Sequence, residues 1–133
     1  MIEFYEMLYH QYAVMKDLIN QLETSQEHCE VIKEFKGDRS TEYAEALYLR
    51  AKAQFMDPST PTTIAFGTIK KSLNIWKNTP LTGGPKDLNH AMSLLMKATM
   101  LAKEMKNYRW SVKVYRKAAT IVSDITGAKL NTE

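Results

Sequence analysis

The positions of glycine and proline constrain this chain more than any other feature, because both residues interrupt helices. They occur at Gly37, at Pro58 and Pro61, at Gly67, in the run TPLTGGP at 79–85, and at Gly127. Between these points apolar residues recur every three or four positions, the spacing of one face of an α-helix, and the alternation typical of strands is absent. The sequence therefore predicts an all-α fold.

Five helices are predicted from these interruptions and from the capping residues beside them. Thr60 is the expected cap of the third helix and Asp87 that of the fourth, while Gly127 is expected to follow the fifth. The predicted helices occupy residues 2–36, 41–56, 61–78, 88–105 and 108–126. We expect one domain over residues 1–133, built as a five-helix bundle or a short array of helical hairpins, with 41–126 as its basic body and 127–133 as a tail.

The predicted helix 2–36 would be roughly 50 Å long at 1.5 Å per residue, which is long for a chain of 133 residues. Its apolar residues follow a heptad spacing that Gln11 and Ser25 interrupt. They are Phe4, Leu8, Met15, Leu18, Leu22, Cys29 and Ile32. Either this helix breaks, near Thr24 and Ser25, or it pairs with a second copy through Phe4, Leu8, Met15, Leu18 and Leu22.

The four later helices share a pattern of small residues that would let helices approach closely. Its members are Ala46/Arg50/Ala53/Met56, Ala65/Ile69/Ser72/Ile75, Ala91/Leu95/Ala98/Leu101 and Ser111/Tyr115/Ala118/Ile121. The second and third helices map onto the fourth and fifth with an offset of 45–46 residues. The pattern indicates two helical hairpins, duplicated from one another.

Two segments, EYAEALYLRAKAQFMDPST and NYRWSVKVYRKAATI, resemble the second helix of a tetratricopeptide repeat. The matching residues are Tyr43, Ala46, Ala53 and Pro58 in the first segment and Tyr108, Tyr115 and Ala118 in the second. Three features depart from the family: the spacing of 65 residues, Ser111 in place of alanine, and Arg50 in place of an aromatic residue. The resemblance implies a peptide- or protein-binding role.

Charge is segregated along the chain. Residues 1–45 carry ten acidic and four basic side chains, whereas the remainder carries five acidic and fourteen basic ones. The acidic first helix could fold back on the basic body or pair with the body of a neighbouring copy, or the body could bind a polyanion. Exposed ion pairs contribute only about 0–1 kcal/mol each, so charge alone does not choose among these arrangements.

The segment KNYRWSVKVYRK at 106–117 mixes basic and aromatic residues. On a helical wheel the basic residues form one stripe, and two apolar stripes contain Tyr108, Tyr115 and Trp110. We therefore expect the aromatic side chains to face the core and the basic stripe to be a solvated surface. The alternative is nucleic-acid binding, because Lys70 and Lys71 correspond to Arg116 and Lys117 under the offset. Its expected contacts are Lys70, Lys71, Lys77, Lys106, Arg109, Lys113, Arg116 and Lys117.

The sequence lacks patterns that would indicate catalysis, a metal site or a cofactor. Cys29 is the single cysteine, and no histidine is spaced four residues from another. Glu3, Glu6 and His10 share a face but have no counterpart on the other helices. Met92, Met96 and Met100 could line an adaptable groove, although a role in the core fits them better. We expect no cofactor, no metal and no small-molecule substrate.

No apolar run approaches the length of a membrane span, and the N-terminus is acidic, unlike a secretory signal. These observations predict a cytoplasmic protein without membrane contact. Its predicted function is that of a non-enzymatic protein-interaction module, such as an adaptor, assembly factor or small regulator, that self-associates through its first helix. The alternative is the nucleic-acid-binding accessory protein described above.

Overall fold

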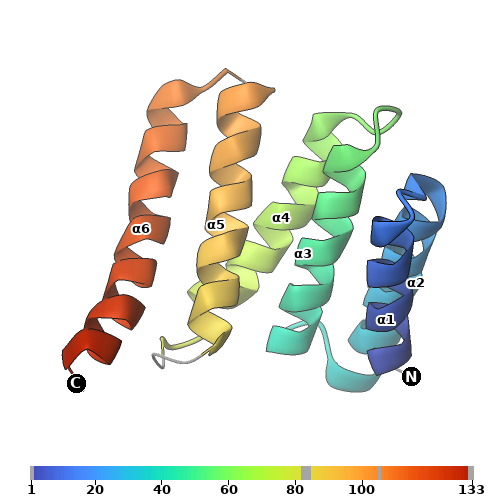
Figure 1. Ribbon diagram of the computed structural model, residues 1–133, viewed down its shortest axis with the longest axis horizontal. Helices are drawn as coiled ribbons and strands as arrows, with labels where there is room; N and C mark the ends of the chain where they lie inside the picture. Colours follow the sequence, from blue (N-terminus) through green and yellow to red (C-terminus); the bar gives the residue numbers. More distant parts are fainter. Residues whose placement is uncertain (1, 82–84, 105, 132–133) are drawn as a thin grey trace. The chain divides into compact units, whose positions relative to one another are not determined.

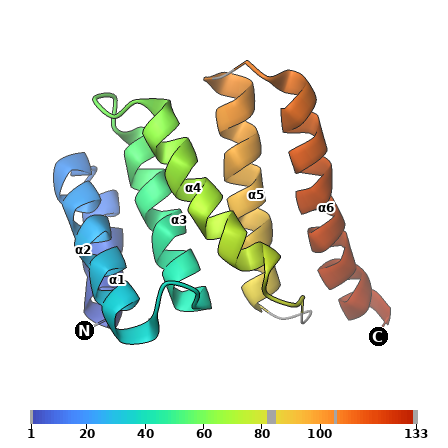
Figure 2. The same ribbon diagram turned by 180° about the vertical axis from the view of Figure 1, so that it is seen from behind.

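The computed structural model describes residues 2–81, 85–104 and 106–131, and within these ranges the chain is all-helical, without β-strands (Figures 1 and 2). Its six helices are α1 (Ile2–Val14), α2 (Leu18–Lys36), α3 (Thr41–Met56), α4 (Thr62–Lys77), α5 (Pro85–Lys103) and α6 (Tyr108–Asn131). The predicted all-α class is confirmed. The prediction of five helices is wrong, because the segment predicted as one helix forms two.

The break between α1 and α2 lies at Met15–Asp17, ahead of the predicted position. Lys16 adopts a left-handed conformation with φ of 57°, and its N–H donates to the carbonyl of Ala13 while that of Asp17 donates to Tyr12. These two bonds form a Schellman motif, which ends a helix and reverses the chain. The Asp17 side chain then caps α2 by accepting from the backbone N–H of Asn20. Thr24 and Ser25, the predicted break point, are buried within α2.

The other helix limits follow the capping residues with three exceptions, the first being that α4 begins at Thr62, so that the predicted cap Thr60 does not directly precede it. Gly37 follows α2, Ser40 caps α3 by accepting from the N–H of Tyr43, and α3 ends before Asp57 as predicted. However, α5 already begins at Pro85, so Asp87 lies in its first turn and is not its cap. Likewise α6 continues past Gly127 to Asn131, since one glycine inside a helix costs only about 1 kcal/mol.

The helices group into two compact units, residues 1–75 and 76–133. In the first unit α1 and α2 lie side by side and antiparallel (Figure 1). The Tyr5 ring near the start of α1 stacks on the His28 ring of α2, with the two ring centres 6.0 Å apart. In the second unit α5 and α6 form a hairpin. The expectation of one domain stays a prediction.

Small residues occupy the buried faces in both units, as the shared pattern predicted. The buried members are Ala46, Ala53, Ala65, Ser72, Ala91, Ala98, Ser111 and Ala118. In the first unit Ser72 of α4 donates to the carbonyl of Ala44 of α3 over 2.8 Å, and Thr68 donates to Gln54 over 2.6 Å. In the second unit Ser111 of α6 donates to the carbonyl of Ala98 of α5 over 2.8 Å. Close helix contact is therefore present in each hairpin, and the duplication itself stays a prediction.

Candidate functional site

Over residues 108–124, α6 presents most of its surface to solvent, because only one narrow stripe packs against α5. That stripe consists of Ser111, Val114, Ala118 and Ile121, all buried. Ser111 fixes which side of α6 faces α5, since its hydroxyl bonds to Ala98. The small side chains of Ser111 and Ala118 let the two backbones approach, whereas an aromatic residue at either position would hold the helices apart.

The aromatic residues of α6 are exposed, so the prediction that they face the core is wrong. The exposed fraction is 62 % for Tyr108, 56 % for Trp110 and 57 % for Tyr115. The packing on α5 buries a face with the small residues Ser111 and Ala118 and with Val114 and Ile121 of one predicted apolar stripe. The larger stripe, with both tyrosines, is left in solvent.

The exposed apolar stripe has the spacing of a coiled-coil contact. It comprises Tyr108, Val112, Tyr115, Ala119 and Val122, and we call it the α6 seam. Its members follow one another at four, three, four and three residues, which is the a/d spacing of a heptad repeat. A single partner helix could therefore cover the whole seam.

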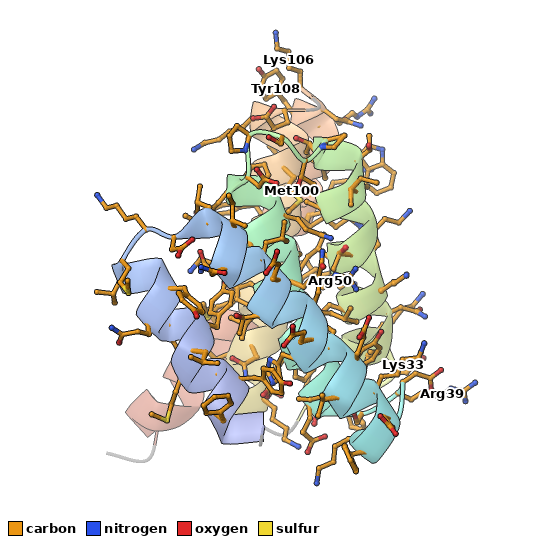
Figure 3. The ribbon with its side chains drawn as sticks, turned by 90° about the vertical axis from the view of Figure 1, so that its right-hand side faces the viewer. Lys33, Arg39, Arg50, Met100, Lys106 and Tyr108 are labelled. Carbon is orange, nitrogen blue, oxygen red and sulfur yellow. The ribbon has the colours of Figure 1, made fainter. Side chains whose placement is uncertain are left out.

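A basic stripe borders the α6 seam. It comprises Lys106, Arg109, Lys113, Arg116 and Lys117, all exposed. The Lys113 ammonium lies 5.2 Å from the centre of the Trp110 ring, within the range of a cation–π contact. Figure 3 shows Lys106 and Tyr108 projecting from the beginning of α6. Basic and aromatic side chains are thus neighbours on the surface, contrary to the sequence-based interpretation.

The other three predicted nucleic-acid contacts are also exposed. Lys70 and Lys71 belong to the first unit, and Lys70 lies 5.7 Å from the centre of the Phe66 ring. Lys77, at the end of α4, belongs to the second unit with the basic stripe. The predicted nucleic-acid contacts are therefore divided between the two compact units, with Lys70 and Lys71 in the first and the others in the second.

The predicted interface residues of the segment 2–36 do not form one continuous stripe, because the chain reverses between α1 and α2. Phe4 and Met15 are exposed, whereas Leu8, Leu18 and Leu22 are half-buried. A different exposed stripe lies on α1, at a spacing of three, four and three residues. It comprises Phe4, Met7, Gln11 and Val14, and we call it the α1 seam.

Sequence reasoning missed a buried polar face on α2. It comprises Gln21, Thr24, Ser25 and His28, each at most 7 % exposed. Neither ring nitrogen of His28 has a hydrogen-bond partner within the described part of the chain, and burial lowers the pKa of this histidine, opposed by the nearby Glu6 carboxylate. The spacing of these residues at three and four positions was the signal in the sequence that could have revealed this face.

The remaining chemically active residues do not assemble into a reactive centre. Cys29 is buried, and burial raises the pKa of its thiol to about 11 despite the nearby Arg50 guanidinium. Among the residues that the structure places, no group of three or more histidine, cysteine, aspartate and glutamate side chains could hold a metal ion. Met100 is fully buried while Met92 is exposed, so the methionines of α5 contribute in part to the core.

Comparisons with known proteins give no family for this chain. No protein-family model matches it, and no curated protein matches its sequence significantly. The resemblance to tetratricopeptide repeats stays a prediction. None of the helices within the described ranges is long and apolar enough to cross a membrane.

Proposed function

We propose that this protein is a non-enzymatic, cytoplasmic interaction module that binds a helix of a partner protein along the α6 seam. The observation that supports the proposal is the exposure of five heptad-spaced residues in one row, among them two tyrosines. Tyrosine and arginine are enriched among the residues that dominate protein interfaces, and both are exposed here, the tyrosines within the seam and Arg109 and Arg116 beside it. An adaptor, assembly factor or small regulator needs such a surface and no catalytic group.

The basic stripe defines the chemistry of the partner. α6 carries five basic residues and one acidic residue, so a partner helix with acidic residues beside its apolar row would be attracted and a basic one repelled. The expected partner is therefore an amphipathic helix of net negative charge. Val112 and Val122 add aliphatic area that has no use in stacking on bases, which favours a protein partner over a nucleic acid.

A designed peptide pair tests this proposal. Both peptides carry leucine at the a and d positions, and the flanking positions hold glutamate in one and lysine in the other. We expect fluorescence anisotropy to show saturable binding of the acidic peptide alone, weakened by the double substitution Arg109→Gln with Arg116→Gln. Lys70→Gln with Lys71→Gln on α4 serves as the charge-matched control and should bind like wild type. Equal binding of both peptides, or no effect of the α6 substitutions, would contradict the proposal.

A second candidate function is single-stranded nucleic-acid binding by the same surface. It rests on the contact between Trp110 and Lys113 and on the exposed tyrosines, because such proteins combine cations with aromatic residues on which bases stack. Anisotropy with a labelled oligonucleotide at about 50 and about 200 mM salt tests it. Removing two phosphate contacts with the Arg109→Gln, Arg116→Gln variant should reduce the salt slope by about 1.4, since each contact with a single strand contributes about 0.7. Absence of binding at the lower salt would exclude this candidate.

A further inference from the structure

We propose that the α6 seam of one copy of this protein binds the α1 seam of a second copy, so that the chain associates head to tail. The inference rests on the proposed function, since it names the helix that the α6 seam takes. The α1 seam and the α6 seam are both exposed in the same chain, and each lies on a helix at one end of the described sequence.

The two seams match in spacing, and the α1 seam fits within the length of the α6 seam. At 1.5 Å per residue the α1 seam from Phe4 to Val14 spans about 15 Å and the α6 seam from Tyr108 to Val122 about 21 Å. Both follow the alternation of three and four residues that keeps one helix face on its partner. The apolar side chains of the α1 seam are Phe4, Met7 and Val14, at 57, 71 and 80 % exposure. The whole α1 seam can therefore pair with part of the α6 seam.

Charge selects this pairing over the two symmetric ones. α1 contains two glutamates and neither lysine nor arginine, whereas α6 has five basic residues and one acidic residue. Pairing α1 with α1 would bring together two helices of net negative charge, and pairing α6 with α6 would bring two basic stripes together; both contacts are repulsive. Beside α1, α2 adds a stripe of exposed carboxylates at Glu23, Glu27, Glu30 and Glu34. Only the α1–α6 contact joins opposite charges.

A head-to-tail contact leaves one free seam at each end of every complex. Such heterologous contacts close into rings or continue as filaments, and they do not stop at a dimer unless the geometry closes. The contact is one pair of helices and falls in the class below about 1,200 Å², so the association is expected to be weak. The average molecular mass in solution should rise with protein concentration and fall with added salt.

Two complementary variants test the pairing. The α6 variant carries Val112→Glu and Tyr115→Glu, and the α1 variant carries Met7→Lys and Val14→Lys. All four positions are exposed, and circular dichroism with a urea titration would verify that each variant folds. The milder pair Tyr115→Gln and Met7→Gln replaces them where the double substitutions reduce helicity. Ile64→Lys, an exposed apolar position on α4, is the control outside both seams.

The experiment is sedimentation equilibrium of the full chain between about 10 and about 500 µM at low salt, a range suited to weak contacts. Wild type and the Ile64→Lys control should associate, and each double variant alone should remain a monomer, with its association weakened about thirtyfold or more. An equimolar mixture of the two double variants should form a one-to-one complex through the α1 seam of the α6 variant and the α6 seam of the α1 variant.

Three results would overturn the inference. Association of the α6 variant alone would indicate pairing between α1 helices, and association of the α1 variant alone would indicate pairing between α6 helices. A monomeric wild type across the whole range would show that a second copy is not the partner. The proposed function is tested separately by the acidic peptide, which a monomeric protein can still bind. Oligonucleotide binding by that monomer, lost on substitution of Arg109 and Arg116, would assign the surface to nucleic acid.

Discussion

Substitution of Lys16 by glycine tests the chain reversal that separates α1 from α2. Lys16 has φ of 57°, a conformation that costs an L-amino acid roughly 1–2 kcal/mol and glycine almost nothing. Glycine in turn loses about 0.5–1 kcal/mol more through the entropy of the unfolded chain. Lys16→Gly should therefore increase the free energy of unfolding by about 0.5–1 kcal/mol.

The expected change in melting temperature follows from the size of the unit. At about 2.1 cal/mol/K per residue, unfolding of residues 1–75 gains about 0.16 kcal/mol/K, and unfolding of all 133 residues about 0.28 kcal/mol/K. Lys16→Gly should thus raise the melting temperature by about 2–6 °C in thermal unfolding followed by circular dichroism. Lys16→Ala keeps the side chain's β-carbon and should give no comparable gain.

The matched control is Glu27→Gly, at an exposed position in the middle of α2. Glycine there should lower the free energy of unfolding by about 1 kcal/mol, because the residue is helical. Opposite signs for the two glycine substitutions would support the break. If Lys16→Gly destabilised the protein as much as Glu27→Gly, residues 2–36 would form one continuous helix, and the reasoning from the Schellman motif would be refuted.

Three further predictions concern buried groups. Ser111→Ala removes the buried hydrogen bond to Ala98 and should lower the free energy of unfolding by about 1 kcal/mol in a urea titration, whereas Ser123→Ala, exposed on the same helix, should leave it unchanged. Burial lowers the pKa of His28 in the folded state, so the unfolded chain takes up this proton at a higher pH and the free energy of unfolding should fall as the pH drops below about 6.5. The urea midpoint should therefore decrease between pH 7 and 5, and His28→Gln should make this decrease smaller. A urea midpoint that does not change over this range would contradict the prediction. The Cys29 thiol, with its pKa raised to about 11, should react with Ellman's reagent at pH 8 much more slowly in the native protein than in urea, and equal rates would show that it is accessible.

The parts of the fold that sequence predicted correctly are those where one residue determines the local backbone. Pro58 requires the end of α3 one residue earlier, and Ser40 supplies the oxygen that caps α3. The break at Lys16 was missed because a lysine in the left-handed conformation has no sequence signature. The cap Asp17 and the apolar Leu18 after it were the available signal.

The site was harder to predict, because periodicity identifies the stripes of a helix but not which stripe has a neighbour. α6 has two apolar rows, one with Tyr108, Val112 and Tyr115 and the other with Trp110, Val114 and Ile121, and the sequence suggested that both lie in the core. Ser111 and Ala118 are buried because the face with the small side chains is the one that approaches α5 closely. Tyr115 is consequently left in solvent. The same limit applies to α2, where the polar residues Gln21 and His28 lie buried.

The exposed seams on α1 and α6 support the proposed association more strongly together than either seam does alone. Both rows are exposed and mainly apolar, with Gln11 as the polar member of the α1 seam, and the α6 seam lies beside lysines and arginines. A surface selected only for solubility would place charges within those rows. Neither row contains a charged residue, and basic residues flank the α6 seam, an arrangement in which electrostatics selects the partner and apolar burial stabilises the contact.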